Sequence, residues 1–248
     1  MLVLAPTFDE YLAIRKEMAL VTTERLAARR SAKGQIGSVA VVLVQSGAGK
    51  VNAASGVAYA LIEHRPDVVL IAGAAGGIDP DLASGTIVVV ERTAQHDHGS
   101  VRDTGLYAWG PKHPGTGRFG DLYAVAASDW TERLERSATG LFAGDSPVVR
   151  GLVVSGDVFV ASEEARDALW RQWRAAAVDR ETAAVAQVCE HAGVPWAAVR
   201  VVTDHADNQA GAMFGLRVDE AGQIAGQVVE QAIERWNDEC ISSAPLHE

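Results

Sequence analysis

Four acidic residues stand where short apolar runs of this sequence end. They are Glu10, Asp179, Glu181 and Asp204. In open α/β sheets, ligands bind beyond the carboxyl ends of the strands, where backbone groups and helix N-termini are free. Carboxylates at that edge can accept hydrogen bonds from a ligand or exchange protons with it. The pattern therefore predicts a site that holds something polar or charged.

The same positions also have simpler interpretations. Glu10 could be an acidic residue of a first helical turn, which the helix dipole favours, and Asp204 could be a cap or turn residue. The glycines of SGAGKVN (46–52) lack P-loop spacing, so they indicate tight turns or close packing rather than phosphate binding. The segment HDH (96–98) stands apart from any further ligand cluster, so a loop network is favoured over a metal site. We expect neither a metal nor a cofactor.

The composition limits the class of protein. The chain has 248 residues, of which 48% are hydrophobic and 22% are charged, a composition typical of soluble globular proteins. Its formal net charge is −10 and it has no dense Lys/Arg run, which argues against a nucleic-acid partner. No run approaches the ~20 apolar residues of a membrane span, and MLVLAP is too short for a signal peptide. Two cysteines suggest a reducing compartment, so we expect a cytoplasmic protein with a small-molecule partner.

Short apolar runs alternate with helical patterns along the chain. The apolar runs cover residues 1–5, 39–45, 67–73, 86–91, 148–156, 175–179 and 195–204. The helical patterns cover residues 7–18, 49–65, 162–173, 181–191 and 218–236. Near-continuous apolar strands are typical of a sheet with helices on both faces. We therefore expect an α/β fold, a three-layer α/β/α sandwich with a mixed, mostly parallel central sheet.

The domain organisation is expected to be simple. The sequence shows no internal repeat and no low-complexity linker, so we expect a single domain over residues 1–248, with a frayed polar tail after about residue 237. The glycine-rich stretch 96–121 is too long for an ordinary connection. It predicts a functional loop or cap.

Several motifs occur together in an order that resembles one family. They are SGAGKVNAA (46–54), DVVLIAGAAGGIDPDLASGTIVV (67–89), HD (96–97), RGLVVSGDVF (150–159), the segment 178–207 and Phe214. Together they resemble the methylthioadenosine/S-adenosylhomocysteine nucleosidases of the purine nucleoside phosphorylase and nucleosidase superfamily, over about residues 1–236. The resemblance implies hydrolysis of the N-glycosidic bond of a purine nucleoside, with release of adenine and a ribose derivative. It also implies a role in methionine salvage and a homodimer, in which region 103–119 reaches the neighbouring subunit's site.

The resemblance implies distinct roles for three carboxylates. Asp204 would be the general acid that protonates purine N7 and makes the leaving base neutral, and Glu10 would lie near the attacking water. Glu181 would accept hydrogen bonds from the 2′ and 3′ hydroxyls of the ribose.

The resemblance also implies the residues that bind substrate. Phe159 would stack on the base, Val160 would present its backbone to the purine edge, and Phe214 would lie over the sugar and its 5′ substituent. Arg200 and Thr203 would position the acid and the water network. Two further positions in the substrate-binding set are Ala74 and Gly76.

Two positions depart from the family's pattern. Where the family usually has Glu-Met-Glu, this chain has Asp179, Arg180 and Glu181, and where it usually has Ser, this chain has Ala74. Arg180 either pairs with Asp179 or another carboxylate, or contacts an anion. That anion would be phosphate acting as the nucleophile or an acidic 5′ substituent, with which arginine forms bidentate bonds.

Three functions therefore remain open. The carboxylate of Glu10, where phosphorylases of the superfamily usually have a phosphate-gripping glycine and arginine, favours water and so a nucleosidase. Arg180 keeps a phosphorylase open, and nucleosidases for other 5′-modified purine nucleosides share these motifs. A non-catalytic nucleoside-binding sensor fits Arg180 and Ala74, although the retained carboxylates argue against it.

Overall fold

The computed structural model of the protein describes residues 1–103 and 105–243. Its helices and strands, in chain order, are β1 (Leu2–Ala5), α1 (Phe8–Lys16), β2 (Ala19–Leu26), β3 (Arg29–Ile36), β4 (Val39–Gln45), α2 (Lys50–His64), β5 (Val69–Gly77), β6 (Ile87–Gln95), β7 (Gly99–Arg102), β8 (Gly105–Ala108), β9 (Ala124–Val125), α3 (Ser128–Phe142), β10 (Val148–Ser155), α4 (Glu163–Trp173), β11 (Ala177–Asp179), α5 (Thr182–Ala192), β12 (Trp196–Asp204) and α6 (Ala210–Ser243).

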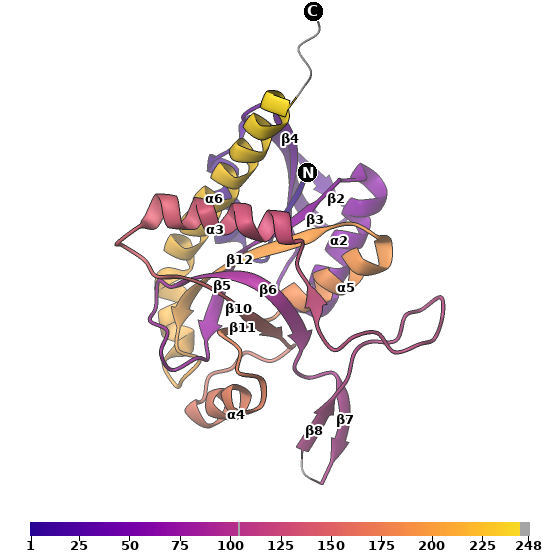
Figure 1. Cartoon of the computed structure of the whole chain (residues 1–248), viewed down its shortest axis with the longest axis vertical. Coiled ribbons are helices and arrows are strands. Elements are labelled where there is room, and N and C mark those ends of the chain that lie inside the picture. Colours follow the sequence, from indigo (N-terminus) through magenta and orange to yellow (C-terminus); the bar gives the residue numbers. More distant parts are fainter. Residues whose placement is uncertain (104, 244–248) are drawn as a thin grey trace, which may run out of the picture.

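A ten-stranded mixed sheet forms the centre of the molecule (Figure 1). Its strands follow the order β11-β10-β6-β12-β5-β1-β4-β3-β2, and β9 pairs with β6. The central strands β12, β5, β1 and β4 run parallel, whereas β2, β3 and β4 are joined as antiparallel neighbours. The expected mixed central sheet is confirmed.

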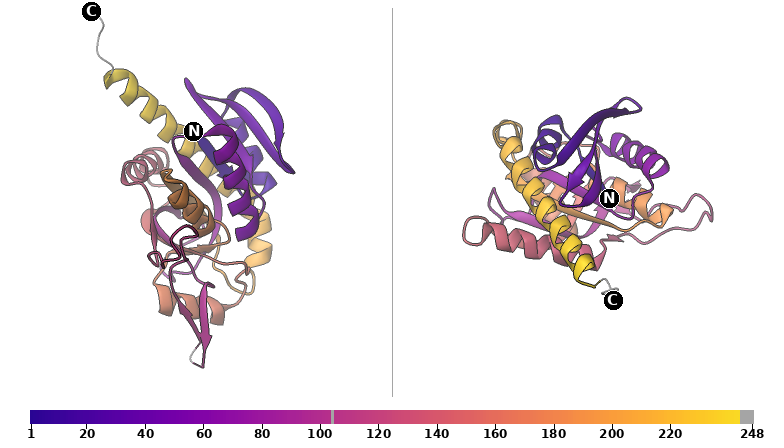
Figure 2. Two further views of the ribbon diagram at one scale, coloured as in Figure 1. Left: turned by 90° about the vertical axis from the view of Figure 1, so that its right-hand side faces the viewer. Right: turned by 90° about the horizontal axis from the view of Figure 1, so that it is seen from above.

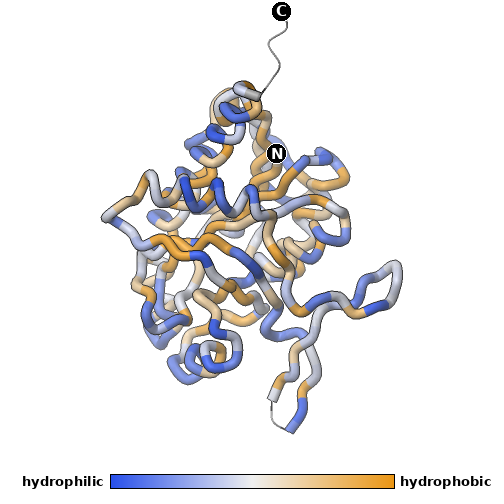
Figure 3. The backbone as a smooth tube through the Cα atoms, in the orientation of Figure 1, coloured by the Kyte–Doolittle hydropathy of each residue, from blue (hydrophilic) through white to orange (hydrophobic). Residues whose placement is uncertain are grey.

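Two apolar cores lie on the two faces of this sheet. Along β1, the side chains of Val3 and Ala5 enter one core, and those of Leu2 and Leu4 enter the other, because successive strand residues point to opposite faces. Helices α1, α3 and α6 contribute to the first core, and α2 and α5 contribute to the second. Figure 2 shows these two helical groups on either side of the strands, and Figure 3 shows hydrophobic residues concentrated along the central strands. The expected three-layer α/β/α arrangement is therefore present.

Five of the strands close into a ring, which the sequence did not predict. Strand β11 pairs in parallel with β10 and also antiparallel with β5, where Val178 faces Gly76. Together with the β10–β6, β6–β12 and β12–β5 pairings, this contact completes a closed ring of strands paired side by side, in the order β5, β12, β6, β10 and β11. The ring brings the junction between β11 and α5 against the end of β5.

Other differences from the expected elements lie at the periphery. Strands β2 and β3 and helix α3 were not predicted, and the expected loop 96–121 contains the β7–β8 hairpin, which projects from the body in Figure 1. Helix α6 continues past residue 237 to Ser243, whereas the end of the expected frayed tail, residues 244–248, lies outside the described residues. None of the helices in the described part combines the length and the hydropathy that a membrane span needs.

Candidate active site

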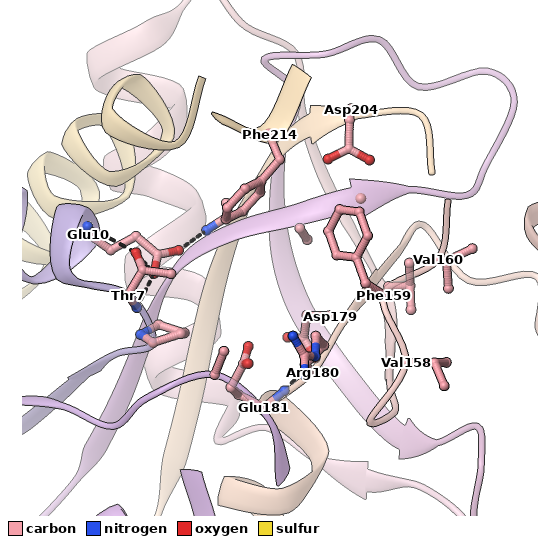
Figure 4. A pocket seen from close by; sticks show the side chains of 16 residues that line it. Thr7, Glu10, Val158, Phe159, Val160, Asp179, Arg180, Glu181, Asp204 and Phe214 are labelled. Atoms are coloured by element: carbon pink, nitrogen blue, oxygen red, sulfur yellow. Dashed lines mark hydrogen bonds between the residues drawn. The ribbon is translucent and has the colours of Figure 1, made fainter. Parts of the chain in front are cut away.

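A cavity opens where β1, β5, β11 and β12 end (Figure 4). The predicted site residues that line it are Glu10, Ala74, Gly76, Phe159, Val160, Arg180, Glu181, Asp204 and Phe214. Arg200 and Thr203, which were also predicted, do not line the cavity but contact carboxylates that do.

Both carboxylate oxygens of Glu10 accept hydrogen bonds from the protein. It is the third residue of α1, where Thr7 caps the helix, and its Oε2 atom accepts hydrogen bonds from the Thr7 amide (2.7 Å) and hydroxyl (2.6 Å). Its Oε1 atom accepts a bond from the amide of Ala74 (2.6 Å). This capping box fixes the orientation of the side chain, which is only 1% exposed.

The close approach of Glu10 to β5 depends on Gly73. A Cβ atom at this position would lie 2.3 Å from Oε1 of Glu10 and 3.1 Å from Nη1 of Arg200. The φ angle of Gly73 is +155°, a conformation that residues with side chains rarely adopt. Glycine is therefore needed here for both the space and the backbone conformation.

Asp204 ends β12 with a carboxyl group that is 3% exposed. Its Oδ2 atom accepts a hydrogen bond from the Thr203 hydroxyl (2.8 Å), and its Oδ1 atom accepts one from the amide of Ala206 (2.9 Å). Burial raises the pKa of Asp204, although these two bonds oppose the effect. A Cβ on Gly76 would lie 3.1 Å from Oδ1, so glycine leaves room for the acid there.

Glu181 stands at the start of α5 and is 5% exposed. Its Oε1 atom accepts a hydrogen bond from the amide of Gly49 at the start of α2 (2.9 Å). Burial and the neighbouring charge of Asp179 raise its pKa to about 7, against the opposing effect of Arg200. At a pH near 7 the carboxyl group is therefore present in both its charged and its neutral form.

Arg200 is completely buried beneath the cavity floor. Its Nη2 atom lies 2.8 Å from Oδ2 of Asp179 and 3.6 Å from Oε2 of Glu181, and its Nε and Nη2 donate to the hydroxyl of Thr182. Burial opposes its charge, but these carboxylates and Glu10 together raise its pKa. Asp179 also accepts bonds from Ser155 and Thr182, so this acid is fully engaged in the floor.

An aromatic wall faces the carboxylates. Phe159 and Phe214 meet edge to face, with ring centroids 6.1 Å apart, and Val160, beside Phe159 in Figure 4, is 8% exposed. Phe159 remains 47% exposed although it lines the cavity. A planar apolar ligand can therefore pack against its face.

Arg180 lines the cavity without a polar partner among the described residues. Among the described residues it has no ion pair and no hydrogen bond, and its buried Nε has no acceptor. Of the two alternatives left open by the sequence, pairing with Asp179 or another carboxylate is therefore absent from the described residues. Arg180 remains available to a ligand.

The segment HDH (96–98) takes part in a loop network. Oδ1 of Asp97 lies 2.6 Å from Nζ of Lys50, and its Oδ2 accepts a bond from the amide of Asp157 (2.8 Å). Asp157 in turn accepts a bond from the amide of Lys50 (2.8 Å). Within residues 1–103 and 105–243, no group of three His, Cys, Asp or Glu side chains is arranged to hold a metal ion.

Sequence reasoning gave no role to several residues that shape the site. Thr7 orients Glu10, and the pattern Thr-x-x-Glu at the start of a helix is a signal that could have identified it. Asp179 was recognised as a charge but not as the partner of Arg200. No sequence signal distinguished Gly73 from the other glycines of β5.

This arrangement suits acid–base chemistry at a bond between a planar base and a polar group. A buried acid faces the aromatic wall, and two further carboxylates lie across the cavity from each other, held by backbone amides (Figure 4). Such groups can donate a proton, position water and accept hydrogen bonds from hydroxyls.

Known proteins resemble the chain along nearly its whole length. The model of the phosphorylase superfamily matches residues 2–234. The 5′-methylthioadenosine/S-adenosylhomocysteine nucleosidase of Geobacillus kaustophilus (strain HTA426) is 32% identical over 222 residues, which cover 89% of this chain and 91% of that protein.

Solved structures give the same picture. The 5′-methylthioadenosine/S-adenosylhomocysteine nucleosidase of Neisseria meningitidis, in complex with methylthio-immucillin-A, superposes with a TM-score of 0.85 at 30% identity, covering 94% of this chain and 98% of that one. A futalosine hydrolase mutant of Helicobacter pylori strain 26695 has a TM-score of 0.82 at 22% identity, covering 94% and 97%. This second likeness shows the fold alone.

Proposed function

Because the chain belongs to the phosphorylase superfamily and, within it, to the 5′-methylthioadenosine/S-adenosylhomocysteine nucleosidases, we propose that it hydrolyses the N-glycosidic bond of a nucleoside of that type. The products are adenine and a ribose derivative. The observation that carries the proposal is that Glu10 of α1, Glu181 at the N-cap of α5 and Asp204 of β12 line one cavity.

Asp204 serves as the general acid. Its raised pKa keeps a larger fraction of the group protonated than an exposed aspartate would have, and only the protonated form can donate. As the bond from the anomeric carbon to N9 breaks, its electrons move into the purine, and the proton of Asp204 moves to N7. Thr203 and the amide of Ala206 stabilise the carboxylate that remains.

Glu10 holds the attacking water. Its Oε1 atom has one protein donor, the amide of Ala74, and a carboxylate oxygen can accept a second bond. A water held there adds its oxygen to the anomeric carbon and loses a proton to the carboxylate. Arg200 acts as a positioning residue, because its ion pairs fix Asp179 and Glu181 beneath the sugar.

Glu181 binds the ribose diol. Its Oε2 atom lies 3.6 Å from Arg200 and Oε1 accepts the amide of Gly49, so lone pairs remain for the 2′ and 3′ hydroxyls. The base then packs against Phe159, with the backbone of Val160 at its edge and Phe214 over the sugar. Gly76 and Ala74 also line the cavity, and their small size leaves space for the ligand.

We further propose the biological setting that the sequence suggested. The chain forms one domain, in keeping with a family match over residues 2–234, acts in the cytoplasm and takes part in methionine salvage. A homodimer is supported by the exposed apolar side chains Val101, Tyr107 and Phe119 on and beside the projecting β7–β8 hairpin. No nucleic acid, membrane or cofactor enters the proposal.

A panel of purine nucleosides tests the function. Free base should be released from methylthioadenosine and S-adenosylhomocysteine in buffer without phosphate, at a rate that added phosphate does not raise. Dependence on phosphate would identify a phosphorylase, and tight binding without turnover would identify a sensor. Release of hypoxanthine from inosine-type nucleosides alone would show that the substrate carries a different purine base.

A further inference from the structure

Arg180 is a cation in a cavity whose acids are already engaged. Glu10 is bonded to Thr7 and Ala74, and Asp204 is bonded to Thr203 and Ala206. Arg180 itself has no protein partner among the described residues. An arginine that lines a cavity without a partner presents a planar fork of donors to whatever binds there.

The acids next to Arg180 in the chain already have another cationic partner. Asp179 and Glu181, its neighbours in the chain, are the partners of Arg200. Arg180 Nη2 lies 3.7 Å from the position that a Cβ on Gly49 would occupy, and Asp157 Oδ1 lies 3.1 Å from the same point. That oxygen already accepts the amide of Lys50, and it forms no ion pair with Arg180.

The position of Arg180 separates it from the attacking nucleophile. Figure 4 shows Arg180 beside Asp179 and Glu181, with Glu10 and Thr7 on the opposite side of the cavity. An anion bound by Arg180 is therefore part of the substrate rather than the group that attacks the anomeric carbon. The base is bonded to C1′, and Glu181 binds the 2′ and 3′ hydroxyls. The 5′ carbon is therefore the position of the sugar that can carry the anionic substituent.

We propose that Arg180 is a specificity-determining residue that binds a carboxylate on the 5′ substituent of the nucleoside. This inference rests on the proposed nucleosidase function and adds that, among its nucleoside substrates, those with an anionic 5′ group are preferred over neutral ones. A guanidinium and a carboxylate form two parallel charge-assisted hydrogen bonds, which a neutral amide cannot match.

A matched pair of substrates tests the inference. One is adenosine with a 5′-(2-carboxyethyl)thio group, and the other carries the 5′-(2-carbamoylethyl)thio group, which has the same shape without the charge. We expect kcat/KM for the parent to favour the carboxylate by about 10- to 100-fold, the size expected for hydrogen bonds to a charged group. In Arg180→Met the ratio should fall to about 1, and in Arg180→Lys part of it should remain because the charge is kept without the fork.

Arg136→Met is the control variant. Arg136 is exposed on α3, and its ion pair is with Glu132 in the same helix, so removing this charge should leave the substrate ratio as in the parent. An unchanged ratio in Arg180→Met would overturn the inference. A rate that rises with added phosphate and loses this response in Arg180→Met would also overturn it, because the anion would then be the nucleophile.

Binding separates this inference from the proposed function. Dissociation constants for both nucleosides are measured on Asp204→Asn, in which turnover is expected to be about 100-fold slower or more, so that binding can be followed before hydrolysis. If the parent releases no adenine from either compound but the carboxylate still binds more tightly, hydrolysis is wrong and the role of Arg180 stands. Equal dissociation constants would overturn the role of Arg180 whatever the activity.

Discussion

Substitution of Gly73 by alanine tests how the fold positions Glu10. The new Cβ would lie 2.3 Å from Oε1 and 2.7 Å from Cδ of Glu10. These separations are shorter than van der Waals contact, so the carboxylate must move. Movement breaks the 2.6 Å bond from the amide of Ala74 and displaces the proposed water-binding atom.

The cost combines two effects. Loss of a buried hydrogen bond to a charged group costs about 1.5–3 kcal/mol, and the backbone strain of a side chain at the φ angle of Gly73 adds at least about 1 kcal/mol. A total of about 2.5–4 kcal/mol should lower the Tm by roughly 5–15 °C for a chain of this size. Because Glu10 is also displaced from the reacting atoms, turnover should fall about 100-fold or more.

Thermal melting and adenine release would be measured on the same preparations. Gly140→Ala is the matched control, because Gly140 lies within α3 and a Cβ there would meet only the guanidinium end of Arg235, at 3.5 Å. That variant should keep full activity and gain up to about 1 kcal/mol of stability from helix propensity. A Gly73→Ala protein with the Tm and activity of the parent would refute the account of how Glu10 is held.

Three further predictions concern the other carboxylates. Asp204→Asn should keep the fold but lose about 100-fold or more in kcat, and an Asn variant as active as the parent would remove this residue from the mechanism. If Glu181 binds the diol, 2′-deoxynucleosides should be poorer substrates for the parent, and Glu181→Gln should narrow the difference; equal handling by both proteins would place the carboxylate elsewhere. The pKa of Glu181 is raised from 4.5 to about 7, so the folded protein holds the proton more tightly than the unfolded chain does. The Tm should therefore fall as the pH rises through this interval, because the unfolded chain loses the proton first. Glu181→Gln should flatten that decline, and profiles of equal slope would contradict the burial argument.

The central strands could be predicted because burial on both faces leaves a plain signal. Strand β4 matches the run 39–45 at both ends, and β12 begins within one residue of its run. Strands β2 and β3 gave no such signal, since their sequences ALVTTERL and RRSAKGQI contain no continuous apolar run, β2 is largely exposed, and β3 buries only Ser31, Ala32 and Ile36. β3 is fixed by antiparallel pairing with β4, and β2 by antiparallel pairing with β3, and these contacts leave no apolar pattern in the two sequences.

The site was predicted in its parts more than in its geometry. The carboxylates at strand ends could be located from the sequence, because parallel strands deliver their carboxyl ends to one edge. The ring closed by β11 and β5 could not, since three residues of β11 carry no mark of a second pairing. The same holds for Arg180, whose lack of a partner depends on Arg200 engaging Asp179 and Glu181 from another strand.

Hydrolysis in ¹⁸O-labelled water tests the central claim most directly. The parent protein is incubated with methylthioadenosine in phosphate-free buffer made with H₂¹⁸O, and the products are weighed by mass spectrometry after a short reaction. We predict equal amounts of adenine and methylthioribose. The methylthioribose should carry one ¹⁸O atom, in the hydroxyl group newly formed at its anomeric carbon. No adenine under these conditions, or adenine formed only when phosphate is added, would contradict the claim that this chain is a nucleosidase.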